Sequence, residues 1–347
     1  MFHWQMAIGT IVGKIVGSLR DTKLGTQRDV LICAALTSAA LLQPLVAQAQ
    51  AERAPIRILV GFPPGGTIDV VARLLADQLK TDLAAPVIVD SRPGAGGQIA
   101  AQALKQAPAD GRTLLLSPDH TMVMLPLTVK SAGFVPLSDF APVGLVARYA
   151  GGFAVANSTN ARSLSEFFTW VKSNPGQGNI GIPAPGSVPQ FLTYMLGQQA
   201  QLALTPVPYR GSAPLLQELL GGQIAAGTTA LGDFIEHHNA GKLRVIGVLS
   251  NKRSSLLPEI PTFIEQGYKV DWEYWLGLFA PAQTAGSEIA RLNAAVGRAL
   301  ARPEIRERLQ KIVFEPAHGS PEQLSDLIKS GTAFWEPVVK SSGWVPQ

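Results

Sequence analysis

Residues 56–79, IRILVGFPPGGTIDVVARLLADQL, decide the fold class of the chain. The first five residues are a short apolar run of strand character, and the Pro- and Gly-rich turn at 63–66 ends it. After the turn, apolar residues recur at helical spacing over 70–79, and Asp69 stands in the first turn, where a carboxylate suits the helix dipole. A strand, a tight turn and an amphipathic helix in this order predict an α/β protein.

The same order of elements recurs along the chain, which also has two extended stretches near 148–156 and 270–280. Repetition of strand, loop and helix predicts mainly parallel sheets covered by helices on both faces. We therefore expect two Rossmann-like lobes joined by two crossover segments, with the C-terminal helices packing on the first lobe. Lobe 1 is expected to comprise residues 50–150 and 276–347, and lobe 2 residues 151–275. Small-molecule sites favour the cleft between two such units.

The N-terminal region is expected to be a leader, residues 1–49. Residues 30–51 carry no charge, basic residues precede them, and Ala47-Gln48-Ala49 supplies a small-x-small cleavage site. This order is typical of a secretory signal peptide cleaved after Ala49. A membrane anchor is the alternative, but Gln43 and Pro44 interrupt the apolar run well before the ~20 residues that a bilayer requires. We expect export to the periplasm.

Charge and cysteine content narrow the function further. The whole chain has 29 basic and 25 acidic residues, and four of the basic and two of the acidic ones belong to the leader. The remaining surface is close to balanced, so a nucleic-acid partner has no electrostatic support. The single cysteine, Cys33, also leaves with the leader, which excludes disulfides. A small-molecule partner and a monomeric state are expected.

No motif of a common enzyme class occurs in the chain. The sequence has no G-x-S-x-G, P-loop, H-E-x-x-H or C-x-x-C pattern, and the dinucleotide-like turn at 94–99 has Ile99 where a third glycine is required. The adjacent pair His237 and His238 points to different faces of a helix, unlike a metal-binding pair. We expect no enzymatic activity, no cofactor and no metal. The weaker alternative is an exported hydrolase that uses Ser117 or Ser187.

Two glycine-rich turns precede helices, one in each expected lobe. They are residues 62–67, FPPGGT, and Pro185-Gly186-Ser187. A helix N-terminus carries about half a positive charge and free N–H groups, so it binds anions without a basic side chain. Each turn alone is compatible with an ordinary helix start. Their matching positions predict that a carboxylate is held between the two lobes.

Several long segments resemble a known family. They are IRILVGFPPGGTIDVVAR (56–73), DSRPGAGGQIAAQAL (90–104), ADGRTLLL (109–116), DFAPV (139–143), VPYRGSAPLLQELLGGQI (207–224), AGKLRVIGVLSNKRSSLLPEIPT (240–262) and YWLGLFAPA (274–282). In sequence and order they are similar to the extracytoplasmic receptors of tripartite tricarboxylate transporters, the Bug family. The resemblance implies a type II periplasmic binding protein that delivers a small carboxylate to an integral-membrane permease. A sensor that signals to a membrane partner remains an alternative.

The resemblance also implies which residues surround the ligand. The loop after the first strand and the start of a second-lobe helix hold the carboxylate in the family, largely through main-chain groups. Asp69 either contacts the ligand or only supports its helix. The implied site residues are Phe62, Pro64, Gly65, Gly66, Thr67, Asp69, Ser117, Asp119, His120, Pro185, Gly186, Ser187, Tyr209 and Thr229.

The chain departs from the family pattern at three places near this site. Pro189 replaces a histidine that many relatives have, Thr228-Thr229 replaces a common Phe-Asp pair, and Asp119-His120 occupies a loop where small hydroxyl residues are usual. An ionised Asp119 repels a second carboxylate but accepts a hydrogen bond from an amine or hydroxyl. We expect a specificity different from that of a plain aliphatic dicarboxylate receptor.

Overall fold

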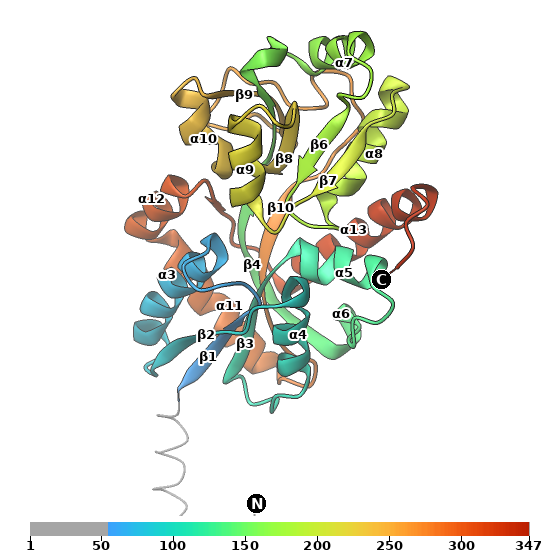
Figure 1. Cartoon of the computed structure of the whole chain (residues 1–347). Helices are drawn as coiled ribbons and strands as arrows, with labels where there is room; N and C mark the ends of the chain where they lie inside the picture. The colour runs from blue at the N-terminus through green and yellow to red at the C-terminus, as the bar shows by residue number, and fades with distance from the viewer. Residues whose placement is uncertain (1–54, 347) are drawn as a thin grey trace, which may run out of the picture. The chain divides into compact units, whose positions relative to one another are not determined.

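Two mixed β-sheets with helices on both faces make up residues 55–346, which are the residues that the computed structural model describes (Figure 1). The expected leader and its cleavage site lie outside these residues. Lobe 1 is built on a six-stranded sheet and lobe 2 on a five-stranded sheet. The predicted two-lobed α/β architecture is confirmed.

The sheet of lobe 1 has two parallel pairs at one side and antiparallel pairs at the other. β1 is parallel to both β2 and β3, and β10 runs antiparallel between β3 and β4. In spatial order its strands are β11 (Glu315–Pro316), β4 (Phe140–Tyr149), β10 (Tyr274–Pro281), β3 (Thr113–Pro118), β1 (Ile56–Val60) and β2 (Val87–Ser91).

Alternate residues of β1 pack against helices on opposite faces of this sheet. Ile58 and Val60 belong to an apolar cluster with α3 (Thr67–Asp82) and α11 (Gly286–Ala301), whereas Leu59 packs in the cluster that contains α4 (Gln98–Lys105). This alternation follows from the two-residue period of a strand. The short helices of the lobe are η1 (Ala95–Gly97), the π-helix η2 (His120–Met124), α5 (Leu125–Thr128) and α6 (Pro136–Asp139).

The sheet of lobe 2 repeats the plan. β6 is parallel to β7 and β8, and β5 runs antiparallel to β8 and β9. In spatial order its strands are β7 (Thr205–Pro208), β6 (Asn179–Ile182), β8 (Ala226–Ala230), β5 (Gly151–Ala156) and β9 (Leu243–Leu249). Its helices are η3 (Asn157–Thr159), α7 (Leu164–Ser173), α8 (Val188–Ala200), α9 (Ser212–Leu220) and α10 (Gly232–Asn239).

The crossover segments make both sheets mixed rather than mainly parallel. β4 and β5 are consecutive strands separated by Ala150, so the chain passes directly from one sheet into the other. The second crossover returns through the segment between β9 and β10 (Figure 1). The reversed strands are β10, which runs antiparallel to β3 and β4, and β5, which runs antiparallel to β8 and β9. The sequence patterns of β4, β5 and β10 do not encode this direction.

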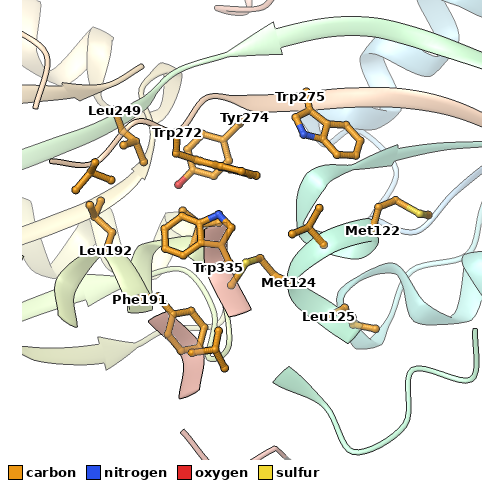
Figure 2. Close-up of a cluster of buried hydrophobic side chains, with 14 of the residues drawn as sticks. Met122, Met124, Leu125, Phe191, Leu192, Leu249, Trp272, Tyr274, Trp275 and Trp335 are labelled. Atoms are coloured by element: carbon orange, nitrogen blue, oxygen red, sulfur yellow. The ribbon is translucent and has the colours of Figure 1, made fainter. Parts of the chain in front are cut away.

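One apolar cluster continues from lobe 1 into lobe 2. Figure 2 shows Met124 of η2 on one side and Phe191 and Leu192 of α8 on the other, with Trp272 and Trp335 between them. Trp272 contacts Trp335 edge to face, with 5.5 Å between the ring centroids. The lobes therefore share part of their core. The expected lobe boundaries at 150 and 275 fall close to where the chain changes sheet, and as domain boundaries they stay a prediction.

The C-terminal helices cover lobe 1, as expected. α11 packs on α3 and β4, and α13 (Pro321–Ser341) packs on β4; between them lies α12 (Pro303–Lys311). α13 begins with a capping box of Ser320 and Gln323. At α7 only half of such a box forms: Ser163 accepts from the Glu166 amide, but the Glu166 carboxylate accepts from the Arg162 amide. Between residues 55 and 346, no helix has the length and apolarity needed to span a membrane.

Candidate ligand-binding site between the lobes

The turn before α3 is held in place by the buried Asp69 carboxylate. The Gly65 amide donates to Asp69 Oδ2 at 3.0 Å, and the Ser91 hydroxyl donates to Oδ1 at 2.9 Å. Arg73 donates to both oxygens, with Nε at 2.8 Å from Oδ2 and Nη2 at 3.1 Å from Oδ1. Hydrogen bonding to Arg73 is the main cause that lowers the pKa of Asp69, and the Gly65 and Ser91 bonds act in the same direction. Asp69 therefore supports the turn, and its two oxygens are fully engaged.

The N-terminus of α3 has no side-chain cap. Its N-cap residue is Gly66, which offers no side chain to the free amides, and the first intrahelical bond runs from the Val70 amide to the Gly66 carbonyl. The amides of Thr67 and Ile68 precede that bond and have no partner within the helix. Gly65 has φ of 79°, a left-handed conformation that suits glycine. The turn thus presents backbone donors at the positive end of a 16-residue helix.

A cavity of about 290 Å³ lies next to this helix terminus, and both lobes form its walls. Its volume is at the small end of the range for small-molecule sites. Lobe 1 and the crossover contribute Gly65, Thr67, Val70, Tyr149, Ala150 and residues 311–314, and lobe 2 contributes Ala230, Gly232 and Asp233. The expected site residues Gly65 and Thr67 therefore face a space that lobe 2 closes.

The lobe 2 wall contains a hydrogen-bonded group of polar side chains. The Thr229 hydroxyl donates to Asp233 Oδ2 at 2.8 Å and lies 3.0 Å from the Ser212 hydroxyl. Asp233 was missed in the sequence, although Thr229 was expected at the site. The available signal was spacing, because Asp233 lies four residues after Thr229, as Asp69 lies four residues after Gly65. A carboxylate is thus present near the position where Thr228-Thr229 replaces the Phe-Asp pair.

The second glycine-rich turn also lies at the boundary between the lobes, but it does not line this cavity. The Gly186 amide donates to Gln190 Oε1 at 2.8 Å, and the Ser187 hydroxyl donates to the Ala184 carbonyl at 2.6 Å. A Cβ at Gly186 would lie 3.0 Å from Thr128 Oγ1 of lobe 1. Gly186 and Ser187 are buried, and Pro185 is exposed. The two turns are related in sequence, but only the first borders the cavity.

The end of β3 is buried rather than open to a cavity. Asp119 is fully buried, accepts from Trp272 Nε1 at 3.2 Å through Oδ2, and has no partner for Oδ1. Burial raises the pKa of Asp119 to about 7, and burial lowers the pKa of His120 to about 4. Ser117 is 2% exposed. Ser117 and Asp119 are therefore buried in the protein interior, and His120 beside them is half-buried. Contact of these three expected site residues with a ligand stays a prediction.

The remaining expected residues, Phe62, Pro64 and Tyr209, do not line the cavity. The Tyr209 hydroxyl donates to Glu218 at 2.6 Å, and burial together with this carboxylate raises the pKa of Tyr209 to about 12. Phe62 is half-buried against the core of lobe 1, and Pro64 is exposed. Among the residues that the structure describes, no group of three or more His, Cys, Asp or Glu side chains is arranged to hold a metal ion.

Several solved structures of known proteins have a fold similar to that of this chain. Solved structures with TM-scores of 0.76 and 0.72 are R. palustris Rpa4515 with adipate and MatC (Rpa3494) from Rhodopseudomonas palustris with bound malate; each is 29% identical, and the matches cover 84% and 82% of this chain and 98% of each structure. The periplasmic binding protein BugD has a TM-score of 0.73 at 28% identity, covering 84% of this chain and 99% of that structure. The fold is that of a periplasmic binding protein.

The sequence comparisons establish the family. The model of the tripartite tricarboxylate transporter family receptor matches residues 71–344. BugT of Bordetella pertussis is 33% identical over 314 residues, which are 89% of this chain and 95% of BugT. The chain belongs to the receptor family of tripartite tricarboxylate transporters, as its sequence predicted.

Proposed function

We propose that the protein is a periplasmic solute receptor that holds the carboxylate of a small acid at the N-terminus of α3, in the cavity between its lobes. The uncapped start of α3 carries this proposal, because its free amides carry a partial positive charge beside a space that both lobes border. The relatives determined with adipate and malate hold dicarboxylic acids. Family membership supports delivery of the ligand to membrane subunits of a tripartite transporter.

The proposal gives the residues of the first turn distinct roles. Gly65, Gly66 and Thr67 provide backbone donors and room for close approach of the ligand. Asp69 orients the turn without contacting the ligand, because Arg73, Ser91 and Gly65 occupy its oxygens. Contacts of the ligand with Pro185, Gly186 and Ser187 remain an expectation, which requires a rearrangement of the packing against Thr128.

An enzymatic role has less support than binding. The Ser187 hydroxyl donates to a backbone carbonyl rather than to a base, and Ser117 is buried. Within residues 55–346, neither serine has a hydrogen bond with a histidine side chain. The family is one of receptors. Export by a cleaved leader and a monomeric state belong to the same proposal.

A capping substitution tests the site directly. Gly66→Asp places a carboxylate at the N-cap of α3, where it accepts from the free amides of the first turn and competes with the ligand. We expect isothermal titration of refolded, ligand-free protein to show binding of a mono-, di- or tricarboxylate to the wild type, and at least tenfold weaker binding to Gly66→Asp. Gly66→Asn, a neutral cap, is expected to weaken binding less.

The matched control is Ala285→Asp, which adds the same carboxylate at the uncapped N-terminus of α11, away from the cavity lining. It is expected to leave affinity within twofold of the wild type. If no acid in the panel binds the wild type, the receptor function is refuted. If acids bind Gly66→Asp as tightly as the wild type, the function stands and the α3 site is wrong.

A further inference from the structure

The cavity between the lobes has side chains of opposite charge on its walls. Asp233 of α10 lies on the lobe 2 side and Lys311, in the last turn of α12, on the lobe 1 side. Thr229 donates to Asp233 Oδ2, and within residues 55–346 neither Asp233 nor Lys311 forms an ion pair. A small acid bound at α3 therefore meets one cationic and one anionic side chain that no other residue neutralises.

The positive side of the cavity combines two features. The free amides at the start of α3 and the exposed Lys311 ammonium both favour an anion, and Gly65, Thr67 and Lys311 border the same space. A carboxylate is the group that accepts from both kinds of donor. This part of the cavity is the carboxylate site already proposed.

Tyr149 also lines this cavity, together with Asp233. The ring of Tyr149 lies on the cavity wall and stacks on Tyr274, with 5.1 Å between the ring centroids. Burial raises the pKa of the Tyr149 phenol well above its ordinary range, and the charges of Asp119 from lobe 1 and Asp233 from lobe 2 raise it further. Asp119 Oδ1 is buried without a hydrogen-bond partner. On this side of the cavity the lining therefore consists of the Asp233 carboxylate and the aromatic ring of Tyr149.

A group that suits this wall is positively charged and small. A metal ion needs several ligands converging on one point, and the described residues contain no such cluster. A protonated amine needs a carboxylate and a hydroxyl acceptor, which Asp233 and Tyr149 of the cavity lining can supply. A cavity of about 290 Å³ has room for one small molecule that carries both the amine and the carboxylate.

We propose that the receptor selects a small acid that carries a protonated amine, with its carboxylate at α3 and Lys311 and its ammonium at Asp233. The inference rests on the proposed function and names the ligand class of that site. Asp233 is the specificity-determining residue, because the α3 amides and Lys311 bind the carboxylate, which every acid has.

Two series of acids that differ in one substituent test the inference by titration calorimetry. They are propionate, lactate and alanine, and succinate, malate and aspartate, in which hydrogen, hydroxyl and ammonium replace one another on the same carbon skeleton. In at least one series the amino acid is expected to bind the wild type at least tenfold more tightly than the unsubstituted acid. The hydroxy acid is expected to lie between them.

Variants assign this preference to Asp233. Asp233→Asn and Asp233→Ser, which both remove the charge and retain a polar side chain that can accept from Thr229, are expected to weaken amino acid binding at least tenfold and to change the affinity of the unsubstituted acid less than twofold. Lys311→Gln is expected to weaken all members of a series by similar factors. The control Glu236→Gln removes an exposed carboxylate from the next turn of the same helix and is expected to change nothing.

The outcomes separate this inference from the receptor function. Equal affinity of the wild type for the three members of each series overturns the inference and leaves the receptor function intact. An amino acid preference that survives in both Asp233 variants overturns the role of Asp233. If no acid of these series or of the broader carboxylate panel binds, the receptor function itself fails.

Discussion

The turns before α3 and α8 have the same hydrogen-bond pattern but different acceptors. In both, a glycine with positive φ donates its amide to the side chain four residues later, Gly65 to Asp69 and Gly186 to Gln190. In lobe 1 the acceptor is a buried carboxylate, and the turn is exposed beside a cavity. In lobe 2 the acceptor is neutral, and the turn is buried against the other lobe.

The difference shows how one turn type serves two purposes. The hydrogen bonds of the buried Asp69 carboxylate hold the first turn in place, and they leave the outer amides of α3 available. The second turn is held in place by side chains distant in sequence, because Thr128 and Trp344 pack on Gly186. Trp344 also donates to the Thr128 carbonyl at 2.9 Å and contacts the ring of Phe191 in α8. The first turn is thus suited to binding and the second to joining the lobes.

The largest expected effect comes from adding a side chain at the second turn. Gly186→Val combines a left-handed backbone with contacts to Thr128 and Trp344, so we expect a loss of about 3 kcal/mol in the free energy of unfolding. Gly65→Val has similar φ but open space around its Cβ, and a loss of about 1–2 kcal/mol is expected. Urea denaturation measures both. Equal losses would show that the two turns are equally packed.

Removal of the two acceptors gives a smaller contrast. Asp69→Ala leaves the Gly65 amide, the Ser91 hydroxyl and the Arg73 guanidinium without their common partner, and a loss of about 2–3 kcal/mol is expected. Gln190→Ala affects one neutral hydrogen bond and is expected to cost about 1 kcal/mol. The same denaturation experiment tests this ranking. A Gln190→Ala variant that is less stable than Asp69→Ala would reverse the comparison.

The charge of Asp69 also predicts a difference in acid sensitivity. Its pKa is lower in the folded protein than the unfolded value of about 3.9, so its contribution to stability is complete above that pH and is lost as the pH falls through the folded pKa. Between pH 5 and pH 2 the wild type should therefore lose more stability than Asp69→Asn. Gln190→Ala should keep the acid sensitivity of the wild type. Parallel curves for wild type and Asp69→Asn would rule out this role of Asp69.

The sequence predicts the local elements better than their directions. The strand at 56–60 and the helical spacing over 70–79 follow from apolar periodicity and turn chemistry, and the structure has both elements. The antiparallel crossing strands depend on which sheet each strand joins, a long-range choice that alternation of apolar residues does not contain. The π-helix after β3 and the burial of Asp119 likewise depend on packing against Trp272 of the second crossover.

In the candidate site, too, some residues could be predicted from the sequence and others depend on tertiary packing. The first turn was predictable because glycine, proline and a first-turn carboxylate mark a helix start that can face a ligand. Asp233 and Lys311 were not, because an acid early in a helix and a lysine late in one are ordinary helix-end residues until folding brings them to one cavity. The second turn was predicted as a helix start that holds a carboxylate, which stays a prediction, and its contact with Thr128 comes from tertiary packing.

A crystal structure of the refolded protein with a small acid that titration shows to bind is the most direct test of the role of α3. We expect one carboxylate oxygen within about 3 Å of the Thr67 or Ile68 amide nitrogen, inside the cavity that Asp233 borders. An acid bound elsewhere, with these amides in contact with solvent, would contradict it.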